Sequence, residues 1–311
     1  MNYMVVGGAG FIGSNLVKRL LNEEDGKVFV YDNFSSGKKE FWGDDVNNDR
    51  LVVIEGDIKD KEQIVKAFDN DIDVVYSLAS NPDIARAVKE PDVDFWEGTY
   101  LINNVLEAMR INGVKKLLYA SGSGVYGDVG HTETDENFSP LRPCSTYGAS
   151  KLGCEALICS YCYMFDMESA VFRFANVVGT NQTHGVGFDF VRKLRDNPSE
   201  LYILGDGTQS KSYIHVEDVM DAIRLTEKKG LTVFEPYNVA TLDSVTVNEI
   251  ADIVVDLMGL KDVKYVYSGG DRGWKGDVPV VRLNSDKIRK MGWANKFTSA
   301  EAMRKAVGSM L

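Results

Sequence analysis

The segment NYMVVGGAGFIGSNLVKRLLNE (residues 2–23) joins a short apolar run to a helical pattern through a glycine-rich turn. Gly7, Gly10 and Gly13 stand in this turn at a G-x-x-G-x-x-G spacing. Glycines permit a tight turn and a close approach of the backbone to a dinucleotide, and the N-terminus of the following helix offers N–H groups to a pyrophosphate. Because glycine-rich turns also occur for purely structural reasons, the rest of the chain has to support this interpretation.

Three further apolar runs end in residues that suit a dinucleotide site. Asp32 ends the second run, 19 residues after Gly13, where a carboxylate accepts hydrogen bonds from the adenosine ribose. The same carboxylate would repel a 2′-phosphate, which favours NAD over NADP. The third run ends at Asp57-Ile58 and the fourth at LAS (78–80). All these markers fall at the carboxyl edge of the predicted sheet, where open α/β sheets bind ligands.

The order of the predicted elements indicates the fold class. Strand-like runs at 2–7, 27–32, 51–57, 73–79, 115–121 and 169–175 alternate with helical patterns. This alternation predicts an α/β protein with a Rossmann-type doubly wound parallel sheet, covered on both faces. After about residue 176 the pattern loosens into glycine-rich loops and helical segments, which predicts a smaller α/β substrate-binding lobe. We expect an NAD-binding domain at 1–175, joined by parts of 210–245, and a second lobe mainly within 176–311.

Charge and hydropathy argue against several other classes of protein. The net charge of −11 disfavours electrostatic binding of nucleic acid. No apolar run approaches the roughly 18 residues of a membrane span, and Met1 leads into the first strand without a signal peptide. We therefore expect a cytoplasmic protein without a membrane or nucleic-acid partner. Cys159 and Cys162 form a CxxC, but the sequence around them fits the buried face of a helix, so we expect no metal.

The stretch STYGASK places Tyr147 and Lys151 four residues apart at the start of a helical segment. This spacing puts both side chains on one face of the helix, about one turn apart. A free phenol holds its proton up to about pH 10, but a neighbouring ammonium and the positive nicotinamide ring both stabilise a phenolate. A tyrosine in that setting can act as a general base near neutral pH. Behind a dinucleotide site, the pair is a candidate catalytic acid/base.

Motifs spread over the chain resemble one known family. They are GGAGFIGS, DNFSSG, GDI, LAS, YASGSGVYG, YGASK, RFANVVG, GDGTQSKSYIHVED and DRGWKGD, in this order. Together they resemble the motifs of the extended short-chain dehydrogenase/reductase family. They are most similar to those of nucleotide-sugar epimerases of the short archaeal UDP-glucose (UDP-galactose) 4-epimerase type. The N-terminal motifs indicate the superfamily, whereas the C-terminal ones are typical of nucleotide-sugar binding.

The resemblance implies an NAD-dependent isomerase acting on a UDP-hexose. Tyr147 would take the proton from the sugar 4-hydroxyl while hydride passes from C4 to NAD, and hydride would return to the other face of the 4-keto sugar. Lys151 would orient the nicotinamide ribose. The implied cofactor contacts are Gly7, Gly10, Phe11, Ile12, Gly13, Asp32, Asn33, Ser35, Ser36, Gly37, Asp57, Ile58, Leu78, Ala79, Ser80, Tyr147 and Lys151. Helices near 92–112 and 145–165 are expected, by resemblance, to pair in a homodimer.

The same resemblance assigns the substrate side. Asn176 stands where the family contacts the sugar diphosphate, and Arg272 and Asp277 match positions that hold the pyrophosphate and the nucleotide ribose. Lys211 stands where the family often has arginine, so a point charge replaces a planar fork. The helix that opens at Gly185-Val186 offers backbone N–H groups to the substrate.

The stretch YASGSGVYG (119–127) departs from the family pattern. Relatives carry consecutive hydroxyl residues there, one of which assists the tyrosine, and alignment on VYG places that hydroxyl at Gly122. Either Ser121 or Ser123 substitutes, or the hydroxyl is absent. Ser123-Gly124 also replaces the Asp-Glu pair of a dehydratase and the glutamate of a decarboxylase, which disfavours both reactions. The alternatives that remain are an epimerase of another nucleotide sugar, such as a UDP-N-acetylhexosamine or a UDP-uronic acid, and a non-catalytic NAD sensor.

Overall fold

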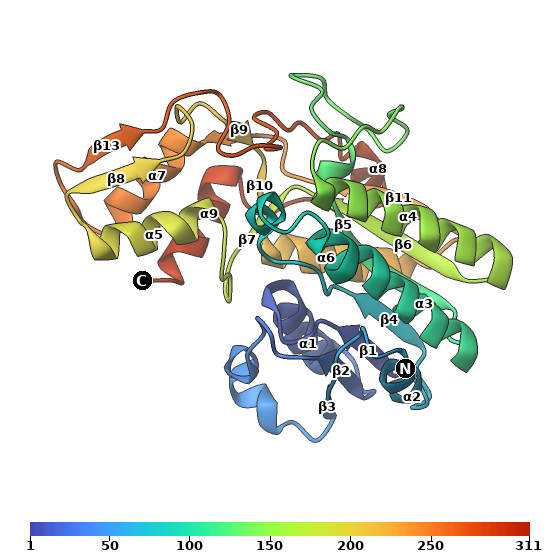
Figure 1. Ribbon diagram of the computed structural model, residues 1–311. Coiled ribbons are helices and arrows are strands. Elements are labelled where there is room, and N and C mark those ends of the chain that lie inside the picture. The colour runs from blue at the N-terminus through green and yellow to red at the C-terminus, as the bar shows by residue number, and fades with distance from the viewer.

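Seven parallel strands form the central sheet of the protein, in the order β11-β6-β5-β4-β1-β2-β3 (Figure 1). The computed structural model describes the backbone of residues 1–311 and every side chain except that of residue 85. The strands are β1 (Tyr3–Val6), β2 (Val28–Asp32), β3 (Leu51–Glu55), β4 (Val74–Ser77), β5 (Lys116–Gly122), β6 (Glu168–Phe174) and β11 (Glu235–Val239). The predicted Rossmann-type sheet is confirmed.

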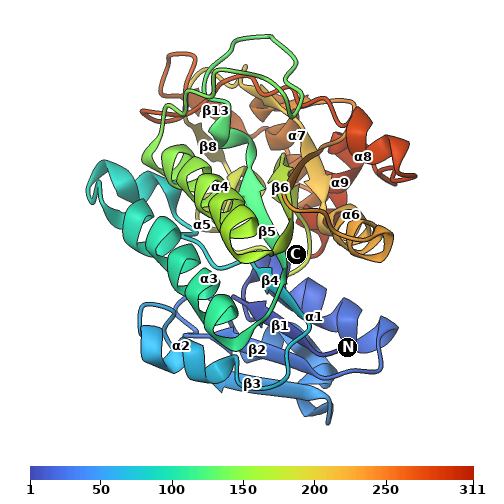
Figure 2. The same cartoon turned by 90° about the vertical axis from the view of Figure 1, so that its right-hand side faces the viewer.

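Helices cover both faces of this sheet, so its strands carry buried apolar side chains on both faces. One face packs against α1 (Phe11–Glu23), α6 (Val216–Lys229) and α8 (Asp286–Lys290). The other face packs against α2 (Lys61–Ala67), α3 (Tyr100–Asn112) and α4 (Thr146–Phe165). Figure 2 shows α3 and α4 on one side of the sheet and α1 and α6 on the other. No helix of the described residues is long and apolar enough to span a bilayer.

The seventh strand has no counterpart among the six predicted runs. β11 reads EPYNV and pairs in parallel with β6 at the edge of the sheet. Its short length, and a proline that cannot donate to a strand ladder, hide it from pattern analysis but suit an edge position. The chain therefore returns to the main sheet through α6 and β11 after it has begun the second lobe.

The second lobe has its own small core. It contains α5 (Val186–Asp196), α7 (Val247–Leu257), α9 (Ser299–Gly308), and the strand pairs β8 (Glu200–Ile203) with β13 (Lys264–Tyr267) and β9 (Ser210–Lys211) with β12 (Val245–Thr246). A third pair, β7 (Asn176–Val178) with β10 (Tyr213–His215), follows the end of β6. Short 3-10 helices lie at Lys39–Asn47, with a kink at Gly43, at Ile84–Val88 and at Ser123–Val125, and a π-helical turn lies at Phe95–Thr99.

Candidate active site

A cleft of about 690 Å³ runs along the carboxyl ends of β1, β2, β4, β5 and β6 and continues into the second lobe. It crosses the point between β1 and β4 where the strand order reverses, the usual ligand site of an open α/β sheet. The structure brings all but two of the predicted site residues to this cleft. They are Gly7, Gly10, Phe11, Ile12, Gly13, Asp32, Asn33, Ser35, Ser36, Asp57, Ile58, Leu78, Ala79, Ser80, Ser121, Ser123, Tyr147, Lys151, Asn176, Gly185, Val186, Lys211 and Asp277.

The glycine turn at the start of α1 is shaped by contacts that exclude side chains. Gly7 has a φ of 80°, and a Cβ there would lie 2.6 Å from the backbone nitrogen of Ala79. A Cβ on Gly13 would lie 2.1 Å from the carbonyl oxygen of Gly7. No side chain caps α1 at Gly10, and its first turn holds no acidic residue. The N-terminal N–H groups of α1 are therefore left for an anion in the cleft.

Asp32 is almost completely buried at the end of β2 and faces the glycine turn. Its Oδ2 accepts the N–H of Ala9 at 2.9 Å, and its Oδ1 accepts the N–H of Phe34 at 2.8 Å. Burial raises the pKa of Asp32, although both N–H donors act in the opposite direction. Each carboxylate oxygen keeps a lone pair for a further donor, such as a ribose hydroxyl.

Gly37 does not line the cleft, unlike its neighbours Ser35 and Ser36. A Cβ on Gly37 would lie 2.6 Å from the Cβ of Ala9, and the next residue, Lys38, donates its N–H to the Ala9 carbonyl at 3.0 Å. Gly37 thus packs behind the glycine turn and supports it.

The start of α4 carries Tyr147 and Lys151 to the end of β5. The Ser145 hydroxyl caps this helix by accepting the N–H of Gly148 at 3.1 Å. A Cβ on Gly148 would lie 2.4 Å from the carbonyl oxygen of Gly124, so the helix approaches the turn after β5 very closely. Buried Lys151 donates from Nζ to the Ala120 carbonyl at 2.7 Å, and Nζ lies 5.5 Å from the ring centre of Tyr147.

The three small residues at the end of β5 differ in their surroundings. Ser121 is buried and donates its hydroxyl to Oε1 of Glu155 at 2.6 Å. Ser123 lines the cleft, and its hydroxyl has no hydrogen-bond partner within the described part of the chain. Gly122 has extended backbone angles, and a Cβ there would meet no heavy atom within 4 Å. The cleft is therefore open at Gly122, and Ser123 carries the available hydroxyl.

The second lobe contributes a set of polar groups to the other end of the cleft. Lys211 on β9 donates from Nζ to Oδ1 of Asp277 at 2.6 Å, and Oδ2 of Asp277 accepts the N–H of Gly273 at 3.1 Å. Helix α5 begins after Gly185, whose φ is 99°, and no side chain caps it. Asn176 lines the cleft at the first residue of β7.

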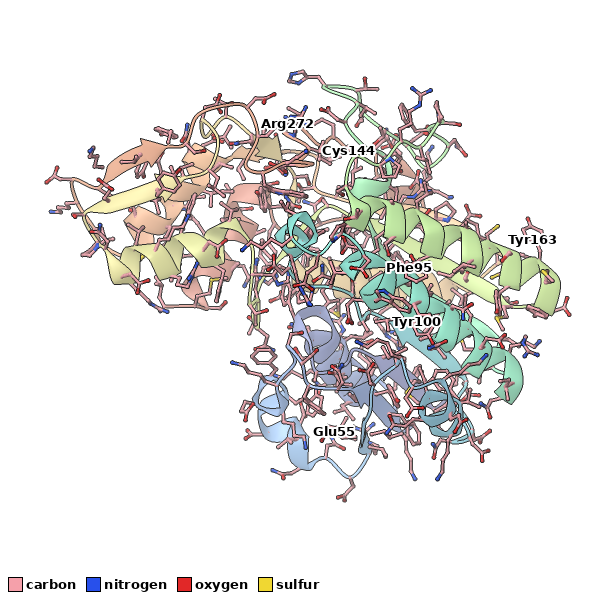
Figure 3. The ribbon with its side chains drawn as sticks, in the orientation of Figure 1. Glu55, Phe95, Tyr100, Cys144, Tyr163 and Arg272 are labelled. Atoms are coloured by element: carbon pink, nitrogen blue, oxygen red, sulfur yellow. The ribbon has the colours of Figure 1, made fainter. Side chains whose placement is uncertain are left out.

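Arg272 lies outside the residues that line the cleft. Its NH2 donates to Oδ2 of Asp128 at 2.6 Å, and its NH1 donates to the backbone oxygen of Asp277 at 2.8 Å. Figure 3 shows Arg272 in the loops above the sheet, near the label of Cys144. The guanidinium that the family resemblance assigns to the pyrophosphate is thus held by the carboxylate of Asp128, in another loop.

The predicted site residues omit several titratable residues that line the cleft, among them Glu97, His184, Lys193 and Asp189, which stands in the first turn of α5. Lys193 projects from α5 and donates from Nζ to the Tyr202 carbonyl at 2.9 Å, while His184 precedes that helix. Burial lowers the pKa of both side chains. The spacing of Val186, Phe190 and Lys193 on one face of α5 is the signal that could have identified the lysine.

Comparison with known proteins identifies the family. The profile of the NAD dependent epimerase/dehydratase family matches residues 3–240, well over half of the chain. The chain belongs to this family. A relative in Methanocaldococcus jannaschii, described as a putative UDP-glucose 4-epimerase, is 32% identical over 99% of this chain and 97% of its own length. The resemblance to the extended short-chain dehydrogenases/reductases is thereby confirmed.

Solved structures of epimerases superpose on this chain over almost its whole length. A UDP-galactose 4-epimerase is 36% identical, with a TM-score of 0.87 over 100% of this chain and 98% of its own. A UDP-glucose 4-epimerase of Thermus thermophilus, solved with NAD, is 31% identical, with a TM-score of 0.86 over 99% and 98%. These neighbours support an enzyme of the epimerase class, and NAD is its cofactor.

Other relatives act on different nucleotide sugars. A UDP-N-acetylglucosamine 4-epimerase of Methanobrevibacter ruminantium, solved with UDP-N-acetylmuramic acid, is 28% identical, with a TM-score of 0.88 over 99% of this chain and 97% of its own. A GDP-mannose 3,5-epimerase of rice is 27% identical over 96% of this chain and 79% of its own length. Membership of the family therefore does not identify the sugar or the nucleotide of the substrate.

The residues of the epimerase cleft fit NAD. The contact of Gly7 with Ala79 excludes a side chain where the pyrophosphate would pass, and the uncapped start of α1 faces the same space. The Asp32 carboxylate stands at the end of the neighbouring strand, where a ribose would lie. At the far end, Lys151 uses one of its three donors on Ala120 and keeps two.

Proposed function

We propose that the protein catalyses the NAD-dependent 4-epimerisation of a UDP-hexose, converting UDP-galactose and UDP-glucose into each other. The observation that carries the proposal is the joint position of Tyr147, Lys151 and the end of β5 in one cleft with the uncapped starts of α1 and α5. The first uncapped helix suits the cofactor pyrophosphate and the second suits the substrate diphosphate. The tyrosine stands where the two ligands would meet.

In this proposal the side chains of the protein move one proton and hold the two ligands. NAD, when bound, supplies a hydride acceptor and donor beside the sugar carbon. Tyr147 removes the proton from the sugar hydroxyl and returns it after the sugar has turned. Lys151, fixed by Ala120, directs its remaining donors toward the nicotinamide ribose and places positive charge beside the phenol.

We assign the second hydroxyl of the site to Ser123. Ser121 already donates to Glu155, so its proton is engaged in a buried hydrogen bond. Ser123 lines the cleft one residue beyond Gly122, the position of the hydroxyl in relatives. Its hydroxyl is therefore the one able to donate to the sugar oxygen.

We assign the nucleotide-sugar diphosphate to the second lobe. Asn176, Lys211 and the N–H groups of Gly185-Val186 would contact it, and Asp277 would bind the nucleotide ribose. Arg272 joins this set only when it leaves Asp128. The domain division follows from this assignment: residues 1–175, with parts of 210–245, bind NAD, and the remainder of 176–311 binds the nucleotide sugar.

The decisive experiment is an epimerisation assay of the purified protein. UDP-galactose should yield UDP-glucose without added NAD, because the cofactor is regenerated in each turnover. UDP-N-acetylglucosamine and UDP-glucuronic acid belong in the same panel, since similar proteins include epimerases of other nucleotide sugars. No turnover of any UDP-sugar would refute the proposal and would favour a non-catalytic NAD sensor, which the intact Tyr147–Lys151 pair disfavours.

We further propose a cytoplasmic homodimer formed through α3 and α4. Phe95 and Trp96, in the helical turn that leads into α3, are 50% and 45% accessible, and Tyr163 and Met164 on α4 are 72% and 70% accessible. Figure 3 shows Tyr100 at the start of α3, Tyr163 on α4, and Phe95 in the turn before α3. Burial of such a surface against a second copy would remove it from water. Light scattering tests this proposal, and a monomeric mass would contradict it.

A further inference from the structure

A buried charge network lies directly behind the end of β5. Glu155 follows Lys151 by one turn of α4 and is almost inaccessible to solvent. Its Oε1 accepts the Ser121 hydroxyl at 2.6 Å, and its Oε2 accepts NH2 of Arg173 at 2.7 Å. Arg173, on β6, pairs with Ser121 in the strand register. Three elements therefore meet at one carboxylate.

The NH1 group of Arg173 has two further acceptors. Its NH1 donates to the Tyr126 hydroxyl at 3.0 Å and to the Glu136 carbonyl at 3.2 Å. A hydrogen-bonded network of this kind favours one geometry, whereas apolar side chains of similar volume would fill the space without directional bonds. Glu155 does not line the cleft, so it has no route to substrate except through its partners.

Helix α4 holds β5 at two successive residues. Lys151 donates to the Ala120 carbonyl, and Glu155 accepts from the Ser121 side chain. The strand needs this support because the next residue, Gly122, has no side chain to pack and its Cβ position is empty. The same helix carries Tyr147, so the two anchors tie the position of the strand end to that of the tyrosine.

We propose that Glu155 is a positioning residue that acts through Ser121. It keeps Gly122, Ser123 and Gly124 at a constant distance from Tyr147, so that the reacting sugar carbon meets the base and the second hydroxyl together. The catalytic part of this inference rests on the proposed epimerase function. The structural part, that Glu155 and Ser121 rigidify the end of β5, does not depend on it.

The test is a double-mutant cycle on kcat with Ser121→Ala, Glu155→Gln and the combined variant. Each single change should lower kcat by about tenfold to a hundredfold, the effect of a small misplacement, while KM changes less than about twofold. The double variant should be no slower than the slower single variant, because both changes remove the same hydrogen bond. Additive losses would mean that Ser121 acts independently of Glu155, and would overturn the inference.

Hydrogen exchange of the NAD-bound protein separates this inference from the proposed function. Ser121→Ala leaves the Glu155–Arg173 ion pair intact and is the variant to use if Glu155→Gln does not fold. Ser121→Ala should accelerate amide exchange at residues 121–124 whether or not the protein proves to be an epimerase. Ser169→Ala is the matched control: it removes a buried hydroxyl that donates to the Val233 carbonyl at 3.5 Å, at the opposite end of β6, and should change neither kcat nor this exchange. Unchanged exchange at 121–124 in Ser121→Ala would overturn the positioning role even in an active epimerase.

Discussion

Nζ of Lys151 donates a 2.7 Å hydrogen bond to the carbonyl oxygen of Ala120, which joins α4 to β5 at the end of that strand in the cleft. This bond turns a flexible side chain into a fixed one and leaves two ammonium donors for other partners. Because Tyr147 lies one turn earlier on the same helix, the position of the phenol follows that of the lysine.

Replacement of Tyr147 by phenylalanine should abolish epimerisation without releasing NAD. The change removes the phenol oxygen that we propose as the base, so kcat should fall by about 10² to 10⁴. The ratio of bound NAD to protein, measured by absorbance after acid release, should stay at the wild-type value. Tyr267→Phe is the control, since Tyr267 on β13 is partly exposed and does not line the cleft. A Tyr147→Phe enzyme with near-normal kcat would remove the base assignment.

Replacement of Gly122 by serine should raise kcat several-fold. Its extended backbone and empty Cβ position accept a side chain without strain, and the new hydroxyl would stand where relatives carry one. Gly122→Ala adds the same Cβ without the hydroxyl and should not raise kcat.

The same substitution tests the role of Ser123. Ser123→Ala should lower kcat by about tenfold, the loss of one hydrogen bond to a charged oxygen, and Gly122→Ser should restore it in the double variant. The two Gly122 substitutions can be compared in the wild-type protein and in Ser123→Ala. If Gly122→Ser and Gly122→Ala give the same kcat in both, a hydroxyl at the end of β5 has no part in the reaction.

Replacement of Asp128 by asparagine should tighten the binding of the nucleotide sugar. The substitution weakens the ion pair that holds Arg272 away from the cleft, and a freed guanidinium can bind a diphosphate with two hydrogen bonds. The KM for the UDP-sugar should fall about threefold to tenfold with little change in kcat. Arg272→Met should raise KM and make the Asp128→Asn change silent. Asp256→Asn, which breaks an exposed ion pair with Arg304, serves as the control. If Asp128→Asn still lowers KM in the Arg272→Met background, Arg272 does not move from Asp128 to the diphosphate.

Arg224 stabilises the edge of the fold remote from the cleft. Its side chain is 3% accessible and contacts the carboxylates of Glu23, Glu24 and Glu227, and its NH1 donates to the Tyr76 hydroxyl at 2.9 Å. Burial raises the pKa of Glu227, whose charge depends on this partner.

Loss of the guanidinium should therefore lower the free energy of unfolding considerably. Arg224→Met would leave a buried carboxylate unpaired and should cost about 3–5 kcal/mol in urea unfolding. Arg304→Met, which removes one partner of an exposed pair, should cost at most about 1 kcal/mol. A similar small loss for both variants would show that solvent reaches the Arg224 cluster.

The features that the sequence determines by itself are local along the chain. The glycine turn, the carboxylate that ends β2 and the Tyr147–Lys151 pair each depend on residues a few positions apart, whose spacing is set by strand and helix geometry. The alternation of apolar runs and helical patterns depends on the same periodicities, which is why the Rossmann-type sheet could be predicted. β11 was missed because an edge strand of five residues with a proline has almost no periodic pattern.

Tertiary packing decided which of these residues are available. Ser121 and Ser123 are equivalent in the sequence, but only Ser121 lies opposite a carboxylate 34 residues away, and that hydrogen bond leaves Ser123 as the open hydroxyl. Arg272 matches a diphosphate ligand by motif, yet a carboxylate 144 residues earlier holds it outside the cleft. Partners of this kind are chosen by the approach of distant segments in three dimensions, because the strength of a hydrogen bond or an ion pair depends on distance, direction and burial.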